Sequence, residues 1–212
     1  MKIAIIGTGA VGSALARGWS RAGLTLILGA RDPNDAGARA LAAAVSARLA
    51  APQAAATEAD IVVLALPWSV AESAVKALGD LAGKIVIDCM NPLVMVDGKL
   101  GLERGFTTSG AEALAVWAPG ARIVKTLNQV GADLMDDAAS LTARPVMFMA
   151  GDDAAAKKTA HTLIEAIGFE AIDAGPLRQA RLLEPLAMVW IDQALVRGAG
   201  RDWAFGVLRR KT

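Results

Sequence analysis

The chain has 212 residues, which is enough for one domain of ordinary size plus a small appendage. Apolar residues make up 54% of it, and 22 basic side chains nearly balance 21 acidic ones, so composition gives no reason to expect a nucleic acid as partner. The single cysteine, Cys89, excludes an internal disulfide framework, and no run approaches the 18 apolar residues of a membrane span. We therefore expect a soluble, cytoplasmic protein with no membrane partner.

The first dozen residues predict a dinucleotide-binding unit. The apolar run Ile3–Ile6 is typical of a parallel strand buried on both faces. A Gly-x-Gly-x-x-Gly motif follows at once, and then an amphipathic helix. We expect the pyrophosphate of a dinucleotide on the free N–H groups at the start of this helix. The expected contacts come from six consecutive residues, Gly7, Thr8, Gly9, Ala10, Val11 and Gly12.

The end of the second predicted strand, residues 24–28, indicates which dinucleotide binds. In this fold the strand meets the adenosine ribose, where NAD-selective proteins usually carry a carboxylate. Here Arg31 comes first, beside the small Ala30, and a guanidinium can bind the 2′-phosphate of NADP. The sequence thus favours NADP(H), although Asp32 leaves NAD open unless it serves the turn at Pro33 and Asn34.

Further strands and helices alternate along the chain, which predicts a doubly wound parallel sheet. The alanine-rich segment 36–59 is expected to be helical and divided by Pro52, and segment 93–108 to be a long loop without structure of its own. The further expected strands are 61–66, 84–88, 122–127, 145–150 and 169–174. We expect an α/β Rossmann-type domain over residues 1–150 and a small helical and strand appendage over 151–212.

Two Ser-x-x-Glu patterns predict capped helix starts, at Ser69 with Glu72 and at Ser109 with Glu112. The first follows a strand directly, so its approach should line the ligand crevice at the carboxyl end of the sheet. That approach consists of Leu66, Pro67 and Trp68. For Trp68, a packing role over the helix start is an equal alternative.

The last long stretch, residues 176–196, has almost no polar face. A helix that is apolar all round must be buried, and little of this chain is left to cover it, so a second copy is expected on it. Pro185 should kink or restart the helix.

Several segments taken together resemble a known family. They are Gly29-Ala30-Arg31, Leu66-Pro67-Trp68, Gly151-Asp152-Asp153, Asp173-Ala174-Gly175-Pro176-Leu177 and Arg181-Leu182-Leu183-Glu184. In this order they resemble the NADP oxidoreductases that depend on coenzyme F-420, a deazaflavin, over essentially the whole chain. Residues 89–92 and 125–130 look more like the bacterial and ferric-reductase-like branches than like the archaeal deazaflavin enzymes.

The resemblance implies a homodimer, which we place on the helix over residues 177–196. It also implies hydride transfer between NADP(H) and a flat acceptor ring, which could be coenzyme F-420 or a flavin. For the acceptor side the candidates are Met90, Asn91, Lys125 and Asn128, with Asn91 also a candidate for the nicotinamide.

The chain is poor in the usual carriers of proton transfer, because it has no tyrosine and one histidine, His161, on a predicted helix face. Hydride transfer between stacked rings needs orientation and exclusion of water more than a proton donor. Two alternatives stay open. One is a reductase of a small carbonyl or imine with Lys125 as acid, a residue that could equally form a surface ion pair. The other is a non-catalytic NADP sensor.

Overall fold

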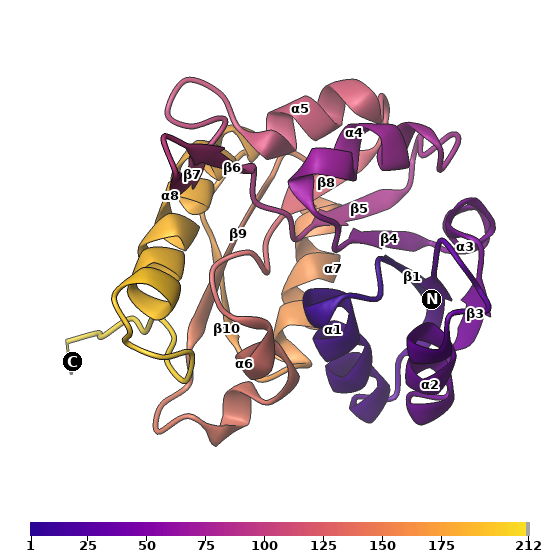
Figure 1. The fold of residues 1–212 in the computed structure, drawn as a ribbon, viewed down its shortest axis with the longest axis horizontal. Coiled ribbons are helices and arrows are strands. Elements are labelled where there is room, and N and C mark those ends of the chain that lie inside the picture. Colours follow the sequence, from indigo (N-terminus) through magenta and orange to yellow (C-terminus); the bar gives the residue numbers. More distant parts are fainter. Residues whose placement is uncertain (211–212) are drawn as a thin grey trace.

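The computed structural model describes residues 1–210, and Lys211 and Thr212, the end of the predicted C-terminal part, lie outside the described residues. A central sheet lies between helices on both faces (Figure 1). Its strands are β1 (Lys2–Ile6), β2 (Thr25–Gly29), β3 (Arg48–Ala50), β4 (Ile61–Leu64), β5 (Ile85–Asp88), β8 (Arg122–Lys125), β9 (Val146–Gly151) and β10 (Glu170–Asp173). The helices are α1 (Ala10–Arg21), α2 (Ala36–Ala44), α3 (Pro52–Glu58), α4 (Trp68–Lys76), α5 (Gly110–Trp117), α6 (Ala132–Asp136), α7 (Ala154–Glu165) and α8 (Ala180–Ile191).

The eight strands lie in the order β10-β9-β8-β5-β4-β1-β2-β3. Six of them, β1 to β5 and β8, are parallel, as predicted, but β9 pairs with β8 antiparallel and β10 follows β9. A parallel return is usually made by an α-helix that crosses the face of the sheet. Between β8 and β9 the chain has only the five-residue α6 and the short 3-10 helix η1 (Ala138–Ser140). The predicted parallel sheet is therefore confirmed for six strands, whereas β9 and β10 run in the opposite direction.

The side chains of β1 alternate between two separate cores. Ile3 and Ile5 pack with α1, α2 and α7, whereas Ala4 and Ile6 pack with α3, α4 and α5. Both faces of the strand are thus covered, which explains its uninterrupted apolar run. Figure 1 shows α4 and α5 at the top of the view, with α1 and α2 below the strands.

Two segments contain strands that the sequence analysis missed. The alanine-rich segment forms α2 and α3 as expected, but Arg48–Ala50 between them is β3, at the edge of the sheet. The expected long loop holds a two-stranded hairpin of β6 (Leu93–Val96) and β7 (Lys99–Leu102). Its turn residues Asp97 and Gly98 have φ of 48° and 74°, as in the Asp-Gly turns that join hairpin strands.

Of the two predicted capping boxes, one is confirmed. The Ser109 side chain accepts a hydrogen bond from the Glu112 N–H at the start of α5. The other is wrong, because α4 already begins at Trp68 and Pro67 occupies its N-cap position, so Ser69 lies inside the helix. The residue before a proline is disfavoured in the helical conformation, so the helix does not extend past Pro67, and it begins two residues earlier than a Ser69 cap would place it.

The C-terminal helix α8 runs without interruption through Pro185, so the predicted restart does not occur. It is preceded by a short 3-10 turn, η2 (Leu177–Gln179), and continues into a π-helical turn, η3 (Asp192–Val196). The following segment packs back on the protein, where Trp190 Nε1 donates to the Trp203 carbonyl and Val146 N to the Phe205 carbonyl.

Candidate functional site

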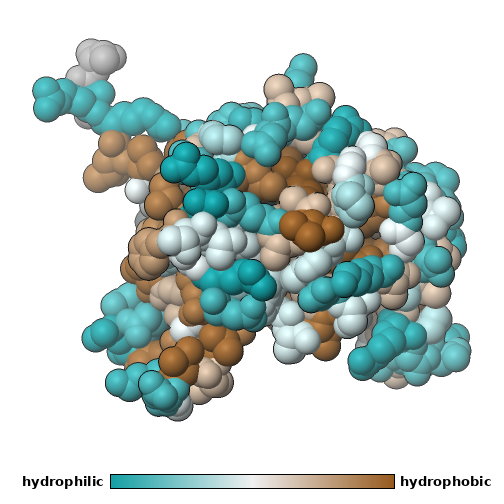
Figure 2. Space-filling model, turned by 90° about the horizontal axis from the view of Figure 1, so that it is seen from above, coloured by the Kyte–Doolittle hydropathy of each residue, from teal (hydrophilic) through white to brown (hydrophobic). Residues whose placement is uncertain are grey.

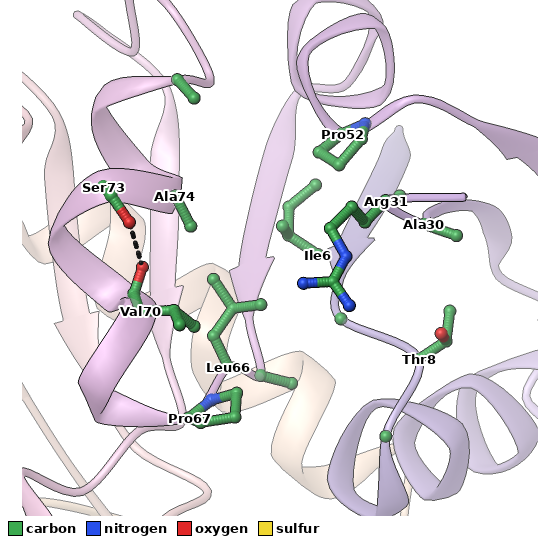
Figure 3. A pocket seen from close by; sticks show the side chains of 15 residues that line it. Ile6, Thr8, Ala30, Arg31, Pro52, Leu66, Pro67, Val70, Ser73 and Ala74 are labelled. Atoms are coloured by element: carbon green, nitrogen blue, oxygen red, sulfur yellow. Dashed lines mark hydrogen bonds between the residues drawn. The ribbon is translucent and has the colours of Figure 1, made fainter. Parts of the chain in front are cut away.

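A cavity of about 610 Å³ opens at the carboxyl ends of β1, β2 and β4. Figure 3 shows Thr8 and Arg31 on one side of it and Leu66, Pro67 and Val70 on the other. Its size falls within the usual range for small-molecule and cofactor pockets. Seven of the predicted cofactor residues line it together: Gly7, Thr8, Gly9, Ala30, Arg31, Leu66 and Pro67.

The three glycines of the motif have different surroundings. Gly7 has φ +105°, and a Cβ on it would lie 2.4 Å from the Ala65 carbonyl oxygen. A Cβ on Gly12 would lie 1.9 Å from the Gly7 carbonyl oxygen, so this glycine is needed for close packing of α1 on the turn. Gly9 has nothing within 4 Å of its Cβ position, which leaves that side of the turn open to a ligand. These are the roles expected of the three positions in a dinucleotide motif.

The start of α1 carries no side-chain cap, and the first bond within the helix is Ser13 N to the Gly9 carbonyl, 2.8 Å. The N–H groups of Ala10, Val11 and Gly12 therefore precede the first helical hydrogen bond. These three residues do not line the cavity with their side chains. They can still hold an anion, because free N–H groups and the positive end of the helix dipole favour a phosphate.

The ribose end of the cavity carries a positive charge. The Arg31 guanidinium lies inside the cavity between Ile6 and Thr8 in Figure 3, and within residues 1–210 it forms no ion pair. Asp32 is occupied elsewhere, since its Oδ1 accepts the Asn34 N–H at 2.8 Å and so closes the turn after β2. Asp35 likewise caps α2 through the Ala38 N–H. The geometry thus leaves Arg31 as the charged group for the ribose, which suits a 2′-phosphate.

The lining of this cavity does not include Asn91 or Asn128, two asparagines that join the loops after β5 and β8. Asn91 Nδ2 donates to the Asn128 carbonyl and Asn128 Nδ2 donates to Asn91 Oδ1, both at 2.9 Å. Asn128 is only 4% exposed and also contacts the Leu183 carbonyl of α8. Its side chain therefore positions Asn91 rather than meeting a ligand directly. Leu127, one residue earlier, is buried with φ +57°, a strained conformation of the kind that clusters at functional loops.

Lys125 lies at the end of β8, and its side chain is fully buried. Its Nζ forms ion pairs with Asp88 Oδ2 at 3.0 Å and Glu184 Oε1 at 2.9 Å, and it also donates to the Met90 carbonyl. Burial alone would lower the pKa of Lys125, but the two carboxylates outweigh it and hold the pKa above its ordinary value. Lys125 is thus neither a surface ion pair nor a poised proton donor at a ligand.

This geometry has counterparts among known proteins. The family model for coenzyme F-420-dependent NADP oxidoreductases matches residues 2–92, the part that carries the glycine motif and Arg31. A crystal structure of a candidate F-420-dependent NADP-reductase from Arthrobacter sp. FB24 is 34% identical and superposes with a TM-score of 0.90, over 99% of this chain and 100% of its own. This chain belongs to the F-420-dependent NADP oxidoreductase family. The family and Arg31 agree on NADP(H) as the cofactor.

Other similar proteins match this chain over only part of their own length. The F-420-dependent NADP reductase of Methanocaldococcus jannaschii is 31% identical over 65% of this chain and 63% of its own. Rat metalloreductase STEAP3 is 28% identical over 88% of this chain, but the match spans 36% of the rat protein. A reductive aminase from Aspergillus terreus, with 24% identity and a TM-score of 0.68, shares the fold. Within residues 1–210, no helix is long and apolar enough to cross a membrane.

Two other residues that the sequence singled out, Cys89 and His161, do not line the cavity. Burial raises the pKa of the Cys89 thiol, and neighbouring Asp88 raises it further, so the residue is a buried, unreactive side chain. His161 is exposed on α7, as the helix pattern predicts. Neither is placed to exchange protons with a bound ligand.

Trp68 packs against α5 and does not line the cavity. Its ring lies 5.2 Å from that of Trp117, and its Nε1 donates to Glu103 Oε2 at 2.7 Å. The geometry fits the packing alternative. The cavity wall that the sequence analysis missed comes from one face of α4, made by Val70, Ser73, Ala74 and Ala77. Their spacing of three and four residues could have identified this face, because it is mostly small and apolar.

Proposed function

We propose that this protein transfers hydride between NADP(H) and a planar redox acceptor, such as the deazaflavin coenzyme F-420 or a flavin. The observation that carries the proposal is the cavity in which an open glycine turn faces Arg31 across the carboxyl end of the sheet. Membership of a family defined by NADP oxidation and reduction supports it. This chain spans only 36% of the rat relative and 63% of the archaeal one, so a shared acceptor is part of the proposal.

Each residue of the site has a role in positioning. The turn at Gly7 to Gly9 and the first N–H groups of α1 bind the pyrophosphate, and Arg31 binds the 2′-phosphate. Asn91, held by Asn128, orients the nicotinamide. Met90 was predicted to lie at the acceptor, but its side chain is only 3% exposed and packs in the core with α4 and α5, so it is not free to contact a ligand. When bound, NADPH supplies the hydride. The protein contributes alignment of the two rings and exclusion of water.

The absence of a proton donor supports a ring acceptor over a small carbonyl or imine. Reduction of a carbonyl needs an acid beside the oxygen on which charge develops. The chain has no tyrosine, its one histidine is exposed on α7, and Lys125 is enclosed by Asp88, Glu184 and Met90. The carbonyl or imine reductase is therefore the weaker candidate.

We further propose that the C-terminal part, residues 151–212, completes the acceptor site and forms a homodimer through the helix over 177–196. Along this helix the exposed side is apolar, with Leu182, Val189 and Val196 exposed to 60%, 51% and 68%. Figure 2 shows apolar residues gathered on the side of the molecule where α8 lies in Figure 1. Such a face favours contact with a second copy. Light scattering should show a dimer for the wild type. It should show a monomer for Leu182→Asp, which places a charge on this apolar face.

The decisive experiment for the proposed reaction is a turnover panel. Purified protein is mixed with NADPH and, separately, with coenzyme F-420, FMN, a ferric chelate and small ketones and imines, and NADPH loss is followed at 340 nm. Turnover with a ring acceptor supports the proposal. Turnover with ketones or imines alone would instead indicate the carbonyl or imine reductase. NADPH binding without turnover of any acceptor would indicate the non-catalytic sensor.

A further inference from the structure

Lys125, Asp88 and Glu184 form a buried trio of charges that the proposed hydride transfer does not use. All three side chains are 0% exposed, and the two carboxylates with one ammonium carry a formal charge of −1. Their hydrogen bonds are satisfied: Asp88 Oδ1 accepts the Met90 N–H at 2.9 Å, and the Glu184 oxygens accept N–H groups of residues 110 and 111. An unbalanced charge that is kept out of water is costly, so its position calls for an explanation.

The trio lies directly behind the loop that carries the candidate nicotinamide residues. Asp88 ends β5, and Lys125 ends β8 beside it, with the two residues paired in register. Met90 is held from both sides, by its N–H on Asp88 and by its carbonyl on Lys125. Asn91 follows Met90, so its Cα lies within about 10 Å of that of Asp88. The negative charge therefore sits behind the carboxyl edge of the sheet, close to where the proposed reaction would occur.

We propose that this trio stabilises the oxidised nicotinamide of NADP⁺ relative to the neutral ring of NADPH. The inference rests on the proposed function. When hydride leaves the ring with its electron pair, the ring becomes a cation and the acceptor gains the hydride, so a positive charge appears near the trio. A buried negative charge acts on it through poorly screening protein. The trio thereby favours NADPH as the donor of the hydride.

A purely structural role for the trio makes a different prediction. If the trio only links β5, β8, α5 and α8, then removing one charge would weaken the binding of NADP⁺ and of NADPH by the same factor. If the trio acts through its charge, the affinities for NADP⁺ and NADPH change by different factors. The ratio of the dissociation constants of NADP⁺ and NADPH is thus the readout, because a general loosening of the fold cancels in it.

The test compares the wild type with Glu184→Gln and Asp88→Asn, each of which makes the trio formally neutral at nearly constant shape. The dissociation constants of NADP⁺ and NADPH are measured by calorimetry on protein whose folding is checked by circular dichroism. One charge about 10–15 Å from the ring, at an effective dielectric of about 20, should weaken NADP⁺ relative to NADPH roughly tenfold. Either folded variant decides the question, because both carry the same change of charge.

Glu112→Gln is the matched control. Glu112 lies on α5 and is paired with Arg181 at 2.6 Å, but about a quarter of each side chain is exposed, so the same change of charge is screened by water. The ratio of the NADP⁺ and NADPH dissociation constants of this variant should stay at the wild-type value. A ratio unchanged within twofold in the folded trio variants would overturn the inference while leaving the proposed function intact. Failure of the wild type to bind either nucleotide would overturn both.

Discussion

Replacing Lys125 by methionine should destabilise this protein far more than the loss of an ordinary lysine. The substitution removes the ammonium that pairs with Asp88 at 3.0 Å and Glu184 at 2.9 Å, and it leaves both carboxylates buried. Each keeps some relief, since Asp88 still accepts the Met90 N–H and Glu184 still caps α5. Breaking a buried pair by removing one partner costs about 3–5 kcal/mol, because the remaining charge is uncompensated.

For a protein of this size that loss corresponds to a fall in Tm of roughly 6–20 °C. Calorimetry and urea unfolding of the wild type and of Lys125→Met measure it. The control is Lys76→Met, which breaks the exposed pair with Glu72 on α4 and should cost less than about 0.5 kcal/mol. The double variant Lys125→Met with Glu184→Gln should recover part of the loss. A Lys125→Met protein within about 1 kcal/mol of the wild type would refute this reasoning, since that lies below the expected cost of a buried unpaired charge.

The pH dependence of stability has a definite sign here. The folded-state pKa of Lys125 lies above its unfolded value of about 10.4, so its contribution is fully present below that pH and is lost as the pH rises through the folded pKa. The difference in unfolding free energy between the wild type and Lys125→Met should therefore not decrease as the pH rises through neutrality. It should shrink only in strongly alkaline solution, and a decrease between pH 7 and 9 would contradict the assigned direction.

Three further outcomes follow from the cavity and its surroundings. Arg31→Ala should weaken NADPH roughly 10- to 100-fold by calorimetry and leave NADH nearly unchanged, because a charge-assisted contact to the 2′-phosphate is lost; equal losses for both would exclude that contact. Gly9→Ala should keep the wild-type Tm yet lose NADPH affinity, whereas Gly12→Ala should lower the Tm, since its Cβ would meet the Gly7 carbonyl at 1.9 Å. Cys89 should react with a thiol reagent only after unfolding, and rapid labelling of the native protein would show that it is accessible.

The sequence predicts the part of the fold in which local chemistry and tertiary structure agree. The run before Gly7 is apolar on both faces because both faces of β1 are covered, and the order of strand, glycine turn and helix follows from it. The β6–β7 hairpin was also readable, since Asp97-Gly98 is a strong turn signal, but the length of the segment favoured a loop. β3 has no such signal, because three residues at an edge among alanines carry almost no pattern.

The sequence predicts a site residue when its position in a local motif determines its surroundings. It does not predict one whose surroundings come from segments far apart in the chain. Arg31 follows a strand end, so its position is known from the fold. The two carboxylates around Lys125 come from Asp88 on β5 and Glu184 on α8, which are 37 and 59 residues away in the chain, and no local pattern shows that they enclose it. The reversed direction of β9 has the same origin, because it depends on how residues 126–145 pack and not on their individual preferences.

The most direct test of the central claim is the fate of a labelled hydride. NADPH carrying deuterium at C4 of the nicotinamide, on each face in turn, is oxidised by the protein with coenzyme F-420 as acceptor, and the reduced deazaflavin is analysed by mass spectrometry. Direct transfer between aligned rings predicts that deuterium from one face only is retained on carbon in the product. Reduced product without deuterium from either face, or no reduction of any planar acceptor, would contradict the account.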